Sequence, residues 1–431
     1  MYAHTVTLSL AIAVFVLAYV LIASEKISRI AIALGGAAAM FVIGATDADK
    51  AFYSHETGID WDVIFLLLGM MIIVGAIHKT GLFEFLAIRG IKKADGSPKK
   101  ALIFLVIFVA LASAILDNVT TILLAFPMTL IVCRQLNVNA IPFLLSEVFA
   151  SNIGGAATLV GDPPNIIIAS RAGLSFNDFL INMAPLVILA MVVVTPLMVW
   201  MFRKELVNTI EDRARVHELD EFSYLKNPNL MKKSLAVLSL VVVGFLAHSV
   251  IHTEPSVIAL LGAGLLIAIS GLKPVDYLQD VEWGTLVFFA GLFVMVGALV
   301  NVGALQMLSD YLAAQVDGKP ELATGVLLVL SAIVSGIVDN IPYVATMSPV
   351  VADLSAVVPA EHGDVLWWSL AFGSDFGGNA TIIGASANVV AVGLAAKAGY
   401  KISFWQFAKY GIPITIISIA IAAPYLFLRF F

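Results

Sequence analysis

The sequence predicts an all-α polytopic membrane protein of two inverted-topology repeats, each with five membrane-crossing helices, one of them broken, and one re-entrant hairpin. Three observations carry this prediction: the composition, the order of the apolar segments, and polar residues that recur at a fixed offset. Of the 431 residues, 60% are hydrophobic and 13% are charged. A soluble domain averages roughly 45–50% apolar and about 25% charged residues. Soluble cores also stop growing near ~250–300 residues, so this chain belongs in a membrane.

The same composition excludes several classes of protein. The single cysteine, Cys133, cannot form an internal disulfide bridge. The net charge of -6 gives no basic surface for a nucleic acid, which we therefore exclude as a partner. The chain contains no GxxxxGK[ST] phosphate-binding loop, so a primary pump that hydrolyses ATP by itself is disfavoured.

Eight segments are apolar and long enough to cross the membrane as single helices, since about 20 residues cover the ~30 Å hydrocarbon layer. They span 4–24, 28–46, 62–82, 183–203, 234–252, 255–271, 284–302 and 408–430. No basic region precedes the first of them, so we expect a retained span rather than a signal peptide.

Four further apolar stretches are interrupted by polar residues. Stretches 140–170 and 365–397 contain Gly, Asn, Asp and Ser, which predicts helices broken within the membrane. Stretches 101–133 and 322–356 each carry an Asp-Asn pair near the middle. These two predict hairpins that enter the membrane and return to the same side.

The basic residues support the hairpins and give an orientation. With both hairpins re-entrant, all 24 Lys and Arg residues except Lys50, Arg171, Lys319 and Arg429 lie on one side. By the positive-inside rule this side is the cytoplasm. We therefore expect a multi-pass protein of the cell (inner) membrane. Its basic loops, around 89–100 and after 203, lie inside, whereas the acidic loops at 47–61 and 305–321 and both termini lie outside.

The internal repeat is visible as matched residues at a constant offset of 222 or 223 positions. The matched pairs are Trp61 and Trp283, Gly69 and Gly291, Gly75 and Gly297, Gly81 and Gly303, Ser113 and Ser335, Asp117 and Asp339, Asn118 and Asn340, Pro127 and Pro349, Ser151 and Ser374, Thr158 and Thr381, and Asn165 and Asn388. Matches of this kind over about 100 residues indicate a duplication. The glycines alone have another explanation, because small residues allow close helix packing.

The repeat divides the chain into two halves and a linker. The first half covers 1–203, with scaffold helices in 4–82, hairpin 101–133, broken helix 140–170 and helix 183–203. A charged cytoplasmic linker covers 204–232. The second half covers 233–431, with scaffold helices in 234–302, hairpin 322–356, broken helix 365–397 and helix 408–430. Five crossings are an odd number, so the halves have opposite orientations, which is typical of secondary transporters.

Four carboxylates fall at the repeated motifs, namely Asp117, Asp162, Asp339 and Asp375. Each costs about 2.5–3.5 kcal/mol at a helix centre on insertion scales, so such residues usually mark ion or proton pathways. No Lys or Arg that could neutralise them occurs in 101–133, 140–170, 322–356 or 365–396, apart from Arg134 just past one end. The alternative is that some are buried neutral or bonded to backbone amides. Glu147 has no counterpart in the second half, where Leu370 stands, and carries less weight.

The turns and breaks also need polar groups of their own. Capping of the hairpin turns is an equal alternative for Asn118 and Asn340. Asp162, before Pro163 and Pro164, resembles the N-cap of a new half-helix. The second break, GASAN at 384–388, has no proline or acid, so its helix break is less pronounced.

One acid and two histidines do not follow the repeat. The second break has no acid at the position of Asp162, but the second half carries Asp375 where the first half has Asn152. Each half therefore keeps one acid near its break, at a different position. His78 and His248 could assist proton transfer, but both lie near span ends, which favours interfacial histidines.

These motifs, and GGAATLVGDPPNIII at 154–168 above all, resemble the ArsB/NhaD branch of the ion transporter superfamily, which includes arsenite permeases, NhaD-type Na⁺/H⁺ antiporters and P proteins. The resemblance covers nearly the whole chain. It implies an elevator-type fold, commonly homodimeric, in which hairpins and broken helices move against a scaffold. The site residues that it and the repeat indicate are Asp117, Asn118, Thr120, Asn152, Thr158, Asp162, Asn165, Asp339, Asn340, Asp375, Thr381, Ser386 and Asn388. Among them Asp117, Asn118, Asp339 and Asn340 are the Na⁺ candidates.

The leading hypothesis is therefore a proton-coupled secondary transporter that exchanges Na⁺ or Li⁺ for H⁺. No cofactor is expected beyond these coupling ions, and the expected partners are the lipid bilayer, a small inorganic ion and a second copy of the chain. Arsenite or antimonite efflux, with a possible separate ATPase subunit, is the main alternative. Sodium-coupled dicarboxylate transport is disfavoured by the tip carboxylates, a passive channel remains open, and an intramembrane protease lacks its Gly-x-Gly-Asp motif because Leu159 stands before Val160 and Gly161.

Overall fold

The computed structural model describes residues 1–431 except 1, 25, 210–215, 217, 317–318 and 360–362. The described residues are helical or irregular and include no strand. Seven of the described helices are long and apolar enough to cross a membrane, and four shorter apolar helices accompany them. The predicted all-helical membrane class is confirmed at this level. Arg213 and Arg215, counted above among the linker's basic residues, lie outside the described residues.

The first half begins with three long helices and two short ones. They are α1 (Tyr2–Ser24), α2 (Arg29–Val42), α3 (Ala48–Tyr53), α4 (Trp61–His78) and α5 (Leu82–Lys93). A hairpin, a broken helix and a last long helix follow: α6 (Pro98–Ser113), α7 (Asn118–Leu136), α8 (Ile141–Gly155), α9 (Pro163–Ala172), α10 (Phe176–Asn182) and α11 (Ala184–Met201). The turn of the hairpin lies at the predicted Asp-Asn pair, and α8 ends at the predicted break.

The second half has a similar order of elements, although no helix corresponding to α10 lies between its last two helices. After the short η1 (Glu221–Tyr224) come α13 (Pro228–Ile251), α14 (Pro255–Ser270), α15 (Pro274–Leu278), α16 (Trp283–Asn301), α17 (Ala304–Val316), α18 (Pro320–Ser335), α19 (Asn340–Val357), α20 (Gly363–Gly377), η3 (Ile382–Gly384), α21 (Ser386–Lys397) and α22 (Phe404–Phe430). The predicted break in stretch 365–397 is thus present between α20 and α21, although no proline lies at this break.

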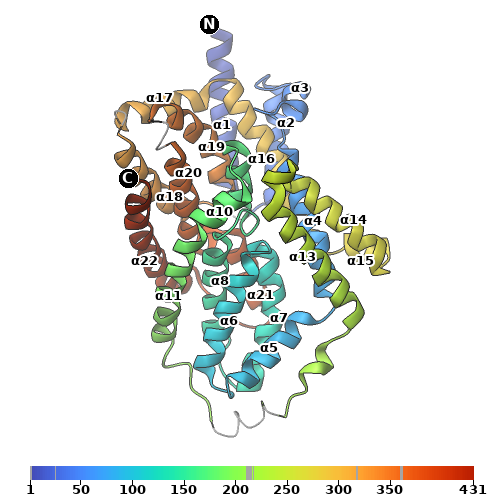
Figure 1. The fold of residues 1–431 in the computed structure, drawn as a ribbon. Coiled ribbons are helices and arrows are strands. Elements are labelled where there is room, and N and C mark those ends of the chain that lie inside the picture. Colours follow the sequence, from blue (N-terminus) through green and yellow to red (C-terminus); the bar gives the residue numbers. More distant parts are fainter. Residues whose placement is uncertain (1, 25, 210–215, 217, 317–318, 360–362) are drawn as a thin grey trace.

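The acidic and basic loops lie at opposite ends of the molecule. Figure 1 shows α3 and α17 at the upper end, together with the N-terminus, and α5 at the lower end. The C-terminus, after α22, also lies in the upper half of the view. This is the relative arrangement that the charge pattern predicts.

Two glycines allow the first helices of one half to pack on the other half. A Cβ on Gly69 of α4 would lie 2.7 Å from the backbone of Ala259 on α14. A Cβ on Gly291 of α16 would lie 2.8 Å from the backbone of Ala33 on α2. These matched glycines therefore serve close packing, the alternative that the sequence left open for them, and the two crossings form the scaffold beside the hairpins.

Candidate functional site

The hairpin turns meet the helix breaks in the middle of the molecule, where irregular backbone is tolerated only if it is buried in protein or lines a cavity. Asp117 caps α7 by accepting a hydrogen bond from the Thr120 amide at 2.8 Å, and Asp339 caps α19 through the Ile341 amide at 3.1 Å. Capping by Asn118 and Asn340, the alternative that the sequence left open, is thus not what the structure shows. The aspartates hold the turns, which leaves both asparagine side chains free to reach the first break.

Asp162 is the acceptor that both hairpins share. Its Oδ2 accepts a hydrogen bond from Asn118 Nδ2 at 2.8 Å, and its two oxygens lie 3.4 and 3.3 Å from Asn340 Nδ2. Asp162 stands at the N-cap position of α9, as the sequence indicated, but its side chain makes no cap hydrogen bond. The residue is fully buried and joins the tips of two hairpins that are remote in the sequence.

A chain of asparagines continues from Asp162 to the second break. Asn118 Nδ2 lies 3.2 Å from Asn152 Oδ1, and Asn152 Nδ2 donates to Asn379 Oδ1 and Asn388 Oδ1, each at 2.9 Å. All of these side chains are buried. The sequence reasoning missed Asn379, although a polar residue in place of Ala156 of the first half was a usable signal.

The two threonines of the repeat hold backbone rather than facing the site. Thr158 donates to the Ala114 carbonyl and Thr381 to the Gly336 carbonyl at 2.7 Å, so each ties a break to its hairpin. Asn165 and Asn388 in turn donate to the carbonyls of Thr158 and Thr381, at 3.2 and 2.8 Å. These matched contacts give both breaks the same internal frame.

A basic residue does neutralise one of the four acids. Arg29, at the start of α2, lies 3.7 Å from Asp339 Oδ2 and donates to Ser386 Oγ at 2.5 Å, and Ser386 Oγ donates to Asp339 Oδ2. The expectation that no basic partner reaches these acids was wrong for Asp339. The interrupted stretches contain no such residue, because the arginine comes from a scaffold helix far away in the sequence.

The other acids have no such cation. Asp375, in α20, is fully buried beside the Asn165 side chain. It lies close enough to Asp162 for their charges to interact, as do Asp117 and Asp339. Glu147 is also buried, and Thr129 of the first hairpin donates to it at 2.5 Å. The described residues thus gather four carboxylates and one guanidinium around the breaks.

A large cavity leads from the upper end of the molecule to the first break. It has a volume of about 1170 Å³, and Leu159 of the break and Ile166 of α9 line its inner part. Five carboxylates line it, together with Arg171 and three histidines: Glu56, Asp60, Asp62, Glu254, Asp353, His55, His248 and His252. We call this cavity the vestibule. Its excess of acids raises the local concentration of cations.

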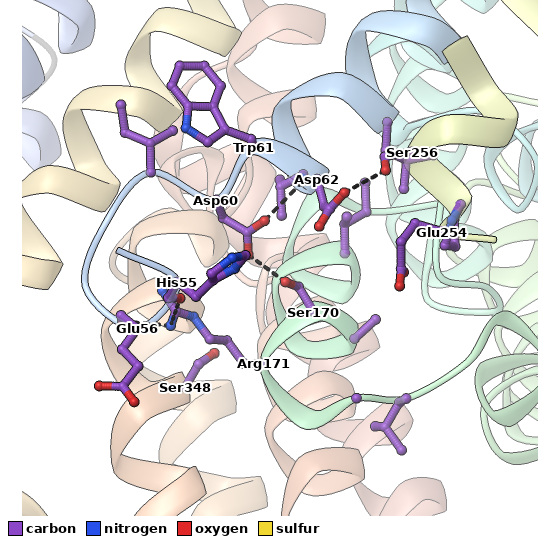
Figure 2. A pocket seen from close by; sticks show the side chains of 18 of the residues that line it. His55, Glu56, Asp60, Trp61, Asp62, Ser170, Arg171, Glu254, Ser256 and Ser348 are labelled. Carbon is purple, nitrogen blue, oxygen red and sulfur yellow. Dashed lines mark hydrogen bonds between the residues drawn. The ribbon is translucent and has the colours of Figure 1, made fainter. Parts of the chain in front are cut away.

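Three contacts bridge the vestibule between α9 and the scaffold. Ser170 donates to Asp60 at 2.5 Å, and Arg171 donates to the Glu56 carbonyl at 2.7 Å and to the His55 carbonyl at 3.3 Å (Figure 2). His248 accepts a hydrogen bond from the Phe176 amide, and His78 is exposed at the end of α4. Both histidines therefore lie at the ends of spanning helices, as expected.

The sequence relationships agree with a transporter of this geometry. Residues 19–373 match the citrate transporter family, CitMHS. The chain belongs to this family. An uncharacterized transporter of Mycobacterium tuberculosis is 55% identical to this CitMHS chain over 424 residues, 98% of each protein. The human P protein is 32% identical over 500 residues, which cover 97% of this chain and 59% of the P protein.

Two solved structures have the same fold as this CitMHS member. The YdaH transporter of Alcanivorax borkumensis gives a TM-score of 0.58 at 13% identity, over 99% of this chain and 98% of YdaH. MtrF of Neisseria gonorrhoeae, described as illuminating a class of antimetabolite efflux pumps, gives 0.60 at 11% identity, over 98% and 95%. The expected superfamily and its P-protein relatives are confirmed, while the family that matches is CitMHS.

One acid at the site stands just outside a spanning helix. Glu282 precedes α16, and burial together with the nearby Asp117 carboxylate raises its pKa to about 7, although Thr285 and Arg29 partly oppose the rise. Because its folded pKa exceeds the ordinary value of 4.5, the native CitMHS chain binds more protons than the unfolded chain across this window. The free energy of unfolding therefore falls as pH rises from about 4.5 to about 7.

We predict that Glu282→Gln removes this pH-dependent loss of stability. The variant should gain melting temperature over the wild type at pH 8, and the gain should shrink at pH 5, when the wild-type carboxyl is protonated. Thermal denaturation of the detergent-purified proteins at both pH values measures it, with Glu321→Gln, at an exposed acid in the first turn of α18, as control. Equal gains at pH 5 and pH 8 would contradict the assignment.

Proposed function

We propose that this CitMHS transporter exchanges a small monovalent cation, Na⁺ or Li⁺, for protons. One observation carries the proposal: Asp162 is fully buried, accepts hydrogen bonds from the tips of both hairpins, and lies among three further carboxylates with one arginine. Such a site has excess negative charge, and a buried excess charge is tolerated only when a cation or a proton neutralises it. The acidic vestibule supports the same substrate class.

We also propose how the ion crosses. The chain would form two inverted repeats, and the hairpins and broken helices would move together as a transport domain against the scaffold. The matched contacts of the two breaks support the repeats. The vestibule contacts from Ser170 and Arg171 to the scaffold loop support the movement, since they join two parts that must separate.

The exchange is tested in proteoliposomes that contain a pH-sensitive dye. Adding Na⁺ or Li⁺ should change the internal pH in the wild type, and Asp162→Asn should abolish the response by removing the charge that holds the cation. Asp310→Asn, at an exposed acid of α17, is the control and should respond normally. A wild type that is silent to both ions, at either sign of the pH gradient, would overturn the proposal.

A second candidate is citrate transport, which the family's name and the Arg29–Ser386 pair favour, because both side chains can donate to a carboxylate. A citrate trianion would meet the acids of the site, so it would need a bound metal ion to offset its charge. The same liposomes, loaded with labelled citrate with and without Mg²⁺, separate the candidates. Citrate or arsenite flux without any Na⁺ or Li⁺ response would replace cation exchange.

The movement of the transport domain is tested by labelling single cysteines from the vestibule side. In a Cys133→Ser background, the exposed Ser170→Cys on α9 should react with an impermeant maleimide at a rate that changes with Na⁺ and pH, because α9 moves away from the scaffold loop. Asp49→Cys, at an exposed position of α3 that is not among the residues lining the vestibule, is the control and should change little. A Ser170→Cys rate that ignores both Na⁺ and pH would count against the movement.

A further inference from the structure

The Arg29 side chain reaches from the scaffold to the tip of the second hairpin. Arg29 begins α2, which packs against α1 and α16, and its guanidinium lies over the Phe288 ring of α16, 5.4 Å from the centroid. One guanidinium nitrogen lies 3.7 Å from Asp339 Oδ2 and donates to Ser386 Oγ, at the start of α21, at 2.5 Å. A single positive charge therefore lies at the boundary between the scaffold and the proposed transport domain.

An arginine at this position does not stabilise its own helix. The N-terminus of a helix carries the positive end of the helix dipole, so basic side chains are favoured at the opposite end. Ser28, at the N-cap position of α2, makes no side-chain cap hydrogen bond either. The reason for a basic residue at position 29 therefore lies in the groups that its side chain contacts.

The contact between Arg29 and Asp339 supplies charge without a direct hydrogen bond. At 3.7 Å the guanidinium nitrogen is beyond hydrogen-bond distance of the carboxylate, and bidentate arginine–carboxylate pairs are much shorter. Ser386 Oγ bridges the two groups, since it accepts from Arg29 and donates to Asp339 Oδ2 at 2.5 Å. The guanidinium can therefore separate from Asp339 by giving up one hydrogen bond to a hydroxyl.

The tip of the first hairpin is built differently. Thr120 Oγ1 donates to Asp117 Oδ2 at 2.5 Å, so this acid finds its hydroxyl donor within its own helix. Pro342 stands at the matching position of the second hairpin and has no hydroxyl. Asp339 therefore takes a hydroxyl donor from another helix and a counter-charge from the scaffold.

We propose that Arg29 is a built-in counter-cation, whose guanidinium neutralises Asp339 while no transported cation is bound there. When the cation leaves, the guanidinium replaces its charge, so release does not leave a buried carboxylate without a partner. When the transport domain moves, Asp339 and Ser386 separate from Arg29, and the carboxylate must then carry a cation or a proton. An empty site therefore stays beside Arg29, which prevents uncoupled movement. This role rests on the proposed cation exchange and names the residue that controls cation release.

Equilibrium binding of ²²Na⁺ and exchange rates in proteoliposomes test the role together. In Arg29→Gln the Kd for Na⁺ and the maximal exchange rate should both fall, each by about tenfold, because no nearby charge replaces the departing cation. Damage to the fold alone would lower the rate without tightening binding. Arg29→Lys should restore both values, and Lys26→Gln, at an exposed position just before α2, is the control. Unchanged or weaker Na⁺ binding in folded Arg29→Gln would overturn the proposal.

Melting temperatures separate this proposal from the proposed function. At pH 8 and equal ionic strength, Arg29→Gln should melt below the wild type in choline chloride, and NaCl should raise its melting temperature more than that of the wild type. Adding Asp339→Asn should remove this extra Na⁺ effect, because the acid is then absent. If the wild type exchanges Na⁺ and Arg29→Gln shows no extra effect, only the counter-cation role fails. If the wild type exchanges no Na⁺, the exchange function fails, and the extra effect still decides whether a cation replaces Arg29 at Asp339.

Discussion

The hydrogen bonds from two hairpin tips to one buried carboxylate organise the centre of this protein. Asp162 lies where the first broken helix restarts, and Asn118 and Asn340 reach it from opposite halves of the chain. Without this shared acceptor, the Asn340 amide would lose both contacts that the described residues give it, and the Asn118 amide would keep only the longer contact to Asn152. The position of both hairpin tips therefore depends on a single buried group.

The two halves of the site differ in their hydrogen bonding. The asparagine chain from Asn118 through Asn152 to Asn388 is neutral and fully paired, so it acts as a fixed frame. Asp375 occupies the place that Asn152 has in the other half, and its two carboxyl oxygens accept no hydrogen bond from the described residues. The acidic vestibule adjoins the first break, since Leu159 and Ile166 are among its lining residues.

The sequence was sufficient for the parts of this structure that depend on composition and repetition. Apolar length predicted the spans, and the Asp-Asn pairs predicted the turns of α6–α7 and α18–α19. The sequence did not predict which way these side chains point. At a turn, either Asp or Asn can cap the following helix or contact the helix break opposite. In the structure Asp117 and Asp339 cap the helices, whereas Asn118 and Asn340 donate hydrogen bonds to Asp162. The Arg29–Asp339 pair was also hidden, since its partners lie 310 positions apart and sequence proximity gives no hint of it.

Equilibrium binding of ²²Na⁺ to the purified protein, measured by scintillation proximity, tests the central claim most directly. The claim is that the cluster around Asp162 binds a cation in competition with protons. The account predicts saturable binding in the wild type that weakens as pH falls, and loss of that binding in Asp162→Asn while the protein stays folded. Binding to Asp162→Asn with the wild-type affinity and pH dependence would contradict it.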